Sequence, residues 1–179
     1  MIQASPELET DRLRFRMLRD SDFPMYETWC ANIDIMRYIG GRTLSQIEAW
    51  RNMAYLIGHW SLRGYGYYAV DEKATGRFIG RVGFTSAAGW PGFELGWMID
   101  PALQGRGYAT EAATFLLRYA FEELDQPHVI SLIHADNTPS RRVAGKLGES
   151  VEGEAVVLGM PCLIHGISRE AWRAQTTAG

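Results

Sequence analysis

The alternation of apolar and polar positions predicts the strands of this chain. Arginine and apolar residues alternate from Arg12 to Met17, which predicts a strand over about 12–18 with one solvated face. Alternating or continuous apolar runs predict six further strands, over about 67–71, 78–85, 93–100, 129–134, 151–158 and 162–168. The sequence therefore predicts seven strands in total.

Helix-start residues and a 3.6-residue period predict helices between these strands, over about 22–32, 46–63, 108–124 and 138–147. The second of them begins with the capping box Ser45-x-x-Glu48. This order of elements favours an α/β (α+β) fold, in which a mixed sheet carries helices on both faces. We expect one domain over residues 1–179, with a frayed tail from about residue 174.

A glycine-rich segment joins the strand that ends near Ile99 to the third helix. The strand is followed by the turn Asp100-Pro101 and then by Gln104–Ala109, which contains Gly105 and Gly107. Glycines let the main chain approach a ligand closely, and the first N–H groups of a helix attract anions. The segment therefore predicts a pyrophosphate site. A plain strand-to-helix turn, in which the glycines only relieve strain, is the alternative.

The six residues from Gln104 to Ala109 resemble the acyl-CoA signature of the GNAT N-acetyltransferase superfamily, which is Gln or Arg, two residues, Gly, one residue, then Gly or Ala. The resemblance implies that acetyl-CoA is the co-substrate and that the preceding strand pairs with the pantetheine arm. The residues that it places at the cofactor are Trp97, Met98, Ile99, Gln104, Gly105, Arg106, Gly107, Tyr108, Ala109, Thr110, Asn137 and Ser140.

The resemblance extends over the whole chain. The element order is similar to the GNAT fold, which implies a twisted, mostly antiparallel sheet of seven strands with helices on both faces. Residues 10–16, 35–39 and 166–172 resemble the ribosomal-protein N-acetyltransferase (RimJ/RimL-like) branch. That branch implies a primary amine as acceptor, either a protein N-terminal α-amine or a small-molecule amine.

Glu94 is the candidate general base. It is a carboxylate in an otherwise apolar strand, where burial would raise its pKa towards neutrality, as proton abstraction requires. Related enzymes use an acid at about this position, often through a water. The alternative is a strand-end glutamate that faces solvent or pairs with an arginine. Tyr38, Trp90 and Trp97 are candidates for the acceptor pocket.

Asn137 and Ser140 open the last predicted helix. The resemblance places the asparagine at the pantetheine arm and Ser140 near the sulfur, whereas helix capping alone is the other interpretation. Many GNAT enzymes protonate the thiolate with a tyrosine four residues before the glycine that closes this helix, and that position is Ala144 here. Ser140 or water would then serve as the acid, unless none is needed. Glu149 stands where an aromatic residue usually follows the glycine, which puts the packing there in doubt.

Composition narrows the other possibilities. The net charge of −3 disfavours nucleic acid as a partner, and no apolar run approaches the length of a membrane span. Two cysteines give no disulfide framework and favour a cytoplasmic protein. No set of metal-ligand residues has the spacing of a metal site, so no metal is expected. A homodimer and a monomer both remain open.

Three functions follow from these observations. The first is an acetyl-CoA-dependent N-acetyltransferase in which the amine attacks the thioester directly in a ternary complex. The others are a CoA-binding regulatory module without turnover, favoured by the missing tyrosine, and an acyltransferase for a larger acyl-CoA such as succinyl-CoA. Arg37 and Arg42 lie in the expected acceptor loop, where they would seat an acidic acceptor or simply face water.

Overall fold

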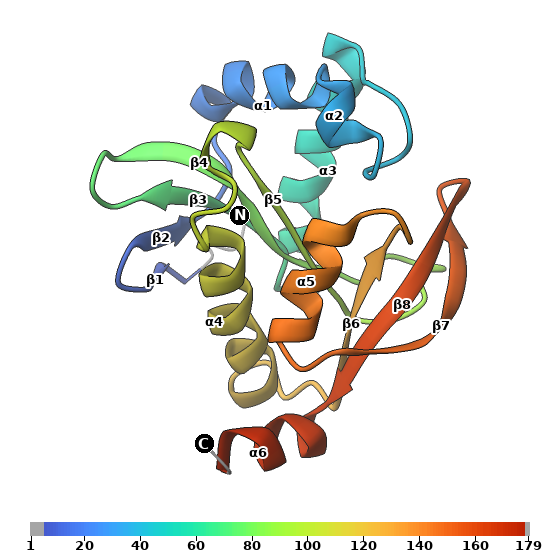
Figure 1. Cartoon of the computed structure of the whole chain (residues 1–179). Helices are drawn as coiled ribbons and strands as arrows, with labels where there is room; N and C mark the ends of the chain where they lie inside the picture. Colours follow the sequence, from blue (N-terminus) through green and yellow to red (C-terminus); the bar gives the residue numbers. More distant parts are fainter. Residues whose placement is uncertain (1–5, 178–179) are drawn as a thin grey trace.

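The computed structural model describes residues 6–177. Their strands form one twisted sheet, with helices packed on its two faces (Figure 1). Its strands are β1 (Leu8–Glu9), β2 (Leu13–Arg16), β3 (Tyr67–Glu72), β4 (Arg77–Thr85), β5 (Glu94–Ile99), β6 (His128–Ile133), β7 (Ser150–Val157) and β8 (Met160–Ser168). They lie in the order β1-β2-β3-β4-β5-β6-β8-β7, and every neighbouring pair is antiparallel except β5 and β6. The mixed, mostly antiparallel sheet is confirmed. It has eight strands rather than seven, because the two-residue β1 adds an edge strand beside β2.

The described residues form the α-helices α1 (Phe23–Cys30), α2 (Ile33–Met36), α3 (Gln46–Arg63), α4 (Tyr108–Glu122), α5 (Thr138–Lys146) and α6 (Arg169–Thr177). The predicted capping box starts α3, where the Ser45 side chain accepts a hydrogen bond from the Glu48 N–H group. The frayed tail expected from about residue 174 is wrong as far as Thr177, because α6 continues to that residue. Residues 178 and 179 lie outside the described part of the chain.

Apolar side chains fill both faces of the sheet, because successive residues of a strand point to opposite sides. Leu95 and Ile99 of β5 are buried in a cluster with Leu116 and Phe121 of α4. Met98 points the other way, into a second cluster that α1 and α3 cover. Figure 1 shows α4 and α5 on one face and α1 to α3 towards the other. The two faces thus provide separate walls on either side of β5.

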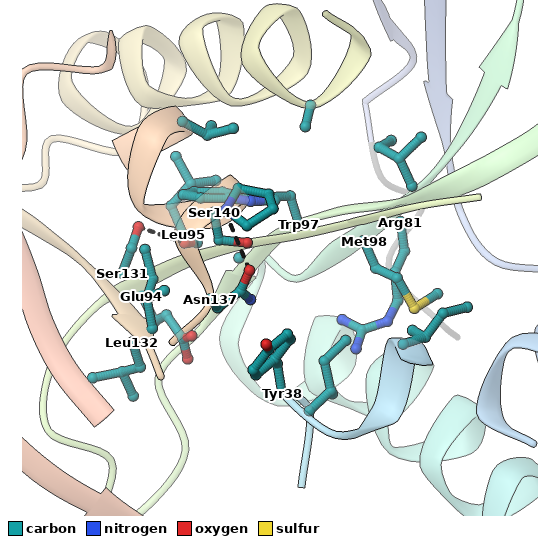
Figure 2. A pocket seen from close by; sticks show the side chains of 18 of the residues that line it. Tyr38, Arg81, Glu94, Leu95, Trp97, Met98, Ser131, Leu132, Asn137 and Ser140 are labelled. Carbon is teal, nitrogen blue, oxygen red and sulfur yellow. Dashed lines mark hydrogen bonds between the residues drawn. The ribbon is translucent and has the colours of Figure 1, made fainter. Parts of the chain in front are cut away.

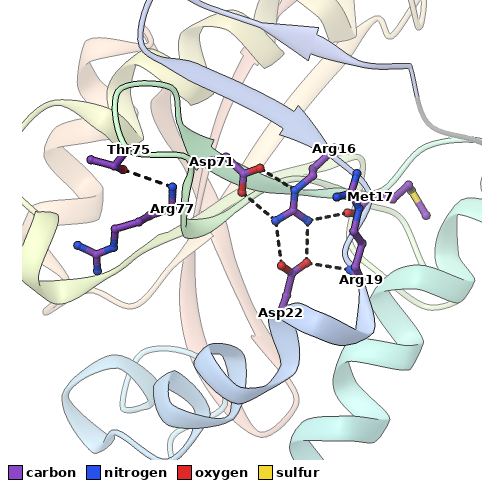
Figure 3. Close-up of polar contacts among 7 residues, drawn as sticks. All are labelled: Arg16, Met17, Arg19, Asp22, Asp71, Thr75 and Arg77. Carbon is purple, nitrogen blue, oxygen red and sulfur yellow. Dashed lines mark hydrogen bonds and ion pairs between the residues drawn. The ribbon is translucent and has the colours of Figure 1, made fainter.

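A buried ion-pair cluster fixes β2, β3 and the start of α1. The Arg16 guanidinium donates two hydrogen bonds to Asp71, at 2.7 and 2.8 Å, and two to Asp22, also at 2.7 and 2.8 Å (Figure 3). Asp22 also accepts from the Arg19 N–H group at 2.8 Å. Burial alone would lower the pKa of Arg16, but the two carboxylates outweigh it and raise that pKa. Every charge in this cluster therefore has a partner.

Candidate active site

A fork between β5 and β6 opens the sheet at its centre. The two parallel strands share a single register pair, Glu94 with Ile130, where the Ile130 N–H group donates to the Phe93 carbonyl at 2.9 Å. One step further, the Ser131 hydroxyl donates to the Leu95 carbonyl at 2.9 Å. Beyond that bond the remainder of β5 is paired with β4 only. One edge of β5 is therefore left for a ligand to pair with.

The main chain of β5 alternates between this open edge and β4. Carbonyls 93 and 95 point towards β6, so Trp97 and Ile99 present their main-chain groups on the same side. Met98 faces β4 instead, where its carbonyl lies against Gly80. Of the three residues predicted to contact the cofactor through the main chain, two face the open edge, and Met98 lines the cavity with its side chain.

The glycine segment forms an anion site at the start of α4. Gly105 and Gly107 have φ angles of 77° and 83°, in the left-handed region that favours glycine. The first bond within the helix runs from the Glu111 N–H group to the Gly107 carbonyl, at 2.9 Å. The N–H groups of residues 108 to 110 thus have no acceptor inside the helix and lie where the helix dipole attracts anions.

Three side chains, those of Arg12, Tyr108 and Gln104, hold this segment in place. Arg12 donates to the Arg106 carbonyl at 3.0 Å and to Glu111 at 2.5 Å. The Tyr108 hydroxyl donates to Glu72 of β3. Gln104 turns back to the Ile99 carbonyl, at 3.2 Å. The main chain at the start of α4 is therefore fixed before any ligand arrives.

The start of α5 lies opposite the open edge of β5. The Asn137 side chain caps the helix by accepting from the Ser140 N–H group at 3.3 Å, and both residues line the cavity (Figure 2). Capping and ligand contact are therefore compatible at this position. Ala144 is fully buried, and its methyl group offers no proton to a leaving group.

Glu94 sits at the vertex of the fork. It is 8% exposed, and the Trp90 indole N–H group donates to one carboxylate oxygen at 2.7 Å. Burial raises the pKa of Glu94 to about 7, although the bond from Trp90 opposes this shift. The interpretation as a solvent-facing or arginine-paired glutamate does not fit, since Glu94 is buried and has no ion pair among the described residues.

These elements surround one cavity of about 860 Å³, within the size range of small-molecule sites. It brings together all the residues predicted for the site except Arg106, namely Glu94, Trp97, Met98, Ile99, Gln104, Gly105, Gly107, Tyr108, Ala109, Thr110, Asn137 and Ser140. Tyr38 and Trp90 also line it, as predicted for the acceptor pocket. Arg106 lies outside and contributes only its carbonyl to the bond with Arg12.

Two predicted arginines already pair with carboxylates, and several polar residues of the cavity were missed. Arg37 pairs with Asp34 at 2.7 Å, and Arg42 pairs with Glu48 at 2.6 Å. Among the missed residues are Tyr67, Arg81 and Thr85, which line the cavity from β3 and β4. Arg81 gave the same signal as Glu94, a charge within an apolar run.

Glu149 is accommodated at its unusual position. It is buried beside β6, where one carboxyl oxygen lies 3.0 Å from the Ser131 hydroxyl oxygen. Burial raises the pKa of Glu149 to about 8. The carboxyl group therefore packs there mainly in its neutral form.

Residues 12–149 match the family model described as an acetyltransferase (GNAT) domain. The chain belongs to the GNAT acetyltransferase family. The N-acetyltransferase YnaD of Bacillus subtilis, itself named as uncharacterized, is 28% identical over 146 residues, which cover 82% of this chain and 84% of YnaD. Acetyl-CoA-dependent transfer of an acetyl group to an amine is general in this family.

Solved structures agree with this assignment. The acetyltransferase from Agrobacterium tumefaciens superposes with a TM-score of 0.84 at 30% identity, over 94% of this acetyltransferase and 98% of that chain. A ribosomal-protein-S5-alanine acetyltransferase from Vibrio fischeri has a TM-score of 0.70 at 19% identity, over 94% and 99% of the two chains, and shows the fold alone.

Residues 6–177 contain neither a metal-ligand cluster nor a helix of membrane-spanning character. No group of three His, Cys, Asp or Glu side chains in that range is arranged to hold a metal ion. None of its helices is long and apolar enough to cross a membrane.

Proposed function

We propose that this enzyme moves an acetyl group from acetyl-CoA to a primary amine by direct attack in a ternary complex, with Glu94 as the general base. The observation that carries the proposal is the fork. A single register pair joins β5 to β6 at Glu94, so the buried carboxyl lies where an open strand edge begins. A thioester paired along that edge and an amine at Glu94 would meet at the vertex.

The proposed positions of the cofactor follow from the main-chain geometry. The diphosphate lies on the N–H groups of residues 108–110, beside Gly105 and Gly107. The pantetheine arm runs along Trp97 and Ile99, with Asn137 on its other side. The Trp97 N–H group, which faces the open edge, is our candidate to polarise the thioester carbonyl, a contact of the kind that contributes on the order of 10²–10³ in rate.

The proposed chemistry balances without a further reactant. Glu94 takes one proton from the ammonium group, directly or through a water, and the neutral nitrogen then attacks the thioester carbonyl. A carbon–nitrogen bond forms as the carbon–sulfur bond breaks, and the CoA thiolate leaves. The proton that the nitrogen still has to lose goes to the thiolate, with Ser140 or water as carrier. A thiol has a pKa of roughly 8.5, so the thiolate also leaves unaided.

The proposed acceptor is a class of primary amines and not a single compound. Residues 10–16, 35–39 and 166–172 resemble the RimJ/RimL-like branch, which supports a protein N-terminal α-amine or a small-molecule amine. We further propose a single acyltransferase domain that works in the cytoplasm, as the unpaired thiols of Cys30 and Cys162 support.

The test is thiol release from acetyl-CoA with a panel of amines, in wild type and in Glu94→Gln. We expect the wild-type kcat/KM to rise with pH through about 7, because the base must be ionised to accept a proton. Glu94→Gln should lower kcat by about 10²–10⁴-fold and remove the rise of kcat/KM with pH. The affinity for CoA, measured by calorimetry, should change little. Unchanged turnover and an unchanged pH profile would retire Glu94 as the base.

The same assay separates the alternatives. CoA binding without thiol release for every amine would favour the regulatory module. Faster release from succinyl-CoA than from acetyl-CoA would favour the larger acyl donor. A normal CoA affinity after Gly107→Leu would refute the diphosphate site, since a bulky residue is strained at its φ of 83°.

A further inference from the structure

Arg81 of β4 is a buried charge on the acceptor side of the cavity. It is 8% exposed and lies on the sheet face that α1 and α3 cover, with its guanidinium 4.5 Å from the centre of the Tyr67 ring. It also lines the cavity. In Figure 2 its side chain points into the pocket from the side opposite Glu94, with Tyr38 between the two in this view.

The positive charge of Arg81 has no partner among residues 6–177. No carboxylate of these residues lies within 4.0 Å of it, and its Nε–H group has no hydrogen-bond acceptor. The groups nearest to it electrostatically are Tyr26, Tyr67 and Cys30. Burial raises the pKa of each of these three, so all are neutral at physiological pH.

Glu94 forms no ion pair with Arg81, although the positive charge of Arg81 lowers the pKa of Glu94 against the larger effect of burial. Arg81 pairs with Met98 across the ladder and Glu94 with Thr85, so the two charged residues are offset by four positions, about 13 Å along the strand. Only the glycine pair Gly83 and Gly96 lies between them on this face of the two strands. The Tyr67 hydroxyl lies over Gly96 and so covers the space between Arg81 and Glu94.

An uncompensated buried guanidinium is costly, because arginine stays protonated and buried charges are normally paired. The cofactor is not the natural partner. Its diphosphate site at the start of α4 belongs to the other face of the sheet, the face of Leu95 and Ile99. The anion that Arg81 lacks must therefore come from what enters the acceptor side.

We infer that Arg81 binds a carboxylate on the acceptor, so that the substrates of this enzyme are small amines that also carry a carboxylate, as amino acids do. The amine lies at Glu94, and the carboxylate lies over Tyr67, where the planar guanidinium offers it two parallel hydrogen bonds. This inference rests on the proposed function and names the acceptor class for that site. A small molecule fits better than a peptide, because both charged groups lie on the floor of one pocket.

The experiment compares acids with their matched amides. Acetylation rates are measured for glycine, β-alanine and 4-aminobutanoate, and for the amide of each, in wild type, Arg81→Gln and Arg81→Lys. We expect wild type to prefer at least one acid over its amide in kcat/KM. Arg81→Gln should lower this ratio by about 30-fold or more, the usual loss when a buried charge pair is broken. Arg81→Lys, which keeps the charge but not the planar fork, should retain part of the preference.

The exposed Arg14 of β2 supplies a matched control, because Arg14→Gln removes an arginine outside the cavity and should leave the acid-to-amide ratio unchanged. Comparing the ratio between variants also cancels the different basicities of acids and amides. An acid-to-amide ratio that is the same in Arg81→Gln as in wild type would overturn the inference. So would a clear preference of wild type for the amides.

A binding measurement covers the case in which a variant fails to fold or no amine turns over. Wild-type enzyme saturated with CoA is titrated with N-acetyl-β-alanine and with its amide, and binding is followed by the fluorescence of Trp90 and Trp97, which line the cavity. Tighter binding of the acid supports the anion site even without turnover, and equal binding overturns it. Turnover of neutral amines without any preference for acids would support the proposed acetyltransferase function. It would refute only the inference that the acceptors carry a carboxylate.

Discussion

Two buried arginines of the same sheet have opposite electrostatic surroundings. Arg81 is buried, and the side chain of Arg16 is only 11% exposed, so both charges are largely removed from water. Arg16 donates four hydrogen bonds to two carboxylates, whereas Arg81 has no carboxylate within 4.0 Å among residues 6–177. Arg16 thus joins elements of the fold together. Arg81 faces a cavity with its charge uncompensated.

The difference teaches how a buried charge is to be interpreted. A charge with all its partners inside the chain contributes to folding, and removing it leaves the partners unpaired. A charge without a partner destabilises the chain alone and is compensated only when a ligand arrives. By this criterion Glu94 belongs with Arg81, since it is buried, lines the same cavity and has a raised pKa.

Arg16→Met should cause the largest change in stability. It leaves the carboxylates of Asp22 and Asp71 buried without their guanidinium, so we expect the free energy of unfolding to fall by about 3–5 kcal/mol. Urea denaturation measures this loss, with the exposed Arg14→Met on the same strand as control. The acid-to-amide ratio in the enzyme that stays folded should not change. A loss below about 1 kcal/mol would show that the cluster is not what joins β2, β3 and α1.

Arg81→Met should have a smaller effect of the opposite sign. The substitution removes an unmatched buried charge and keeps a side chain of similar length, at the cost of a cation–π contact with Tyr67. We expect the free energy of unfolding to stay the same or to rise by up to about 2 kcal/mol, measured in the same urea titration. A loss of 3 kcal/mol or more would place Arg81 with Arg16 as a structural residue and end the comparison.

The sequence could indicate which residues line the α4 side of this cavity because the signals there are local. Glycines with positive φ, a strand directly before them and a helix directly after them lie within about fifteen residues, from Leu95 to Thr110. Glu94 was found because alternation along β5 is regular, and it stands out on a face with Gly96 and Met98. The same alternation gave the two core faces correctly.

The place of Arg81 in the cavity was missed because it depends on an irregularity in β4. Val70 pairs with Gly80 and Asp71 with Phe78, so Ile79 is an extra residue in β4. Strict alternation along β4 would place the side chains of Phe78 and Arg81 on opposite faces of the sheet. Because of the bulge, the two side chains lie on the same face. Nothing in the sequence marks that bulge, so Arg81 could not be assigned to the pocket.

The helix α6 was missed from the sequence for another reason. α6 is polar along most of its length, and no apolar stripe indicates a helix there. It is anchored by Trp172, whose ring centre lies 5.2 Å from that of Phe121 in α4. A single aromatic contact with a residue some fifty positions earlier in the chain leaves no periodic signal.

The smallest expected effect is that of Arg37→Gln, which tests whether an arginine must be unmatched to select the acceptor. Arg37 lines the same cavity as Arg81, but its guanidinium already pairs with Asp34 at 2.7 Å, and both side chains are more than half exposed. Exposed pairs of this kind contribute about 0–1 kcal/mol. We therefore expect the acid-to-amide ratio to change by less than about fivefold, far less than in Arg81→Gln.

The measurement is the amine panel in the two variants side by side, at low and at high salt. Salt screens exposed charges strongly and buried ones weakly, so any effect of Arg37 should shrink as salt is added, whereas that of Arg81 should persist. If Arg37→Gln abolished the preference for acids and Arg81→Gln did not, the exposed Arg37 at the rim of the pocket would be the residue that binds the acceptor carboxylate. The unmatched charge on its floor would then need another explanation.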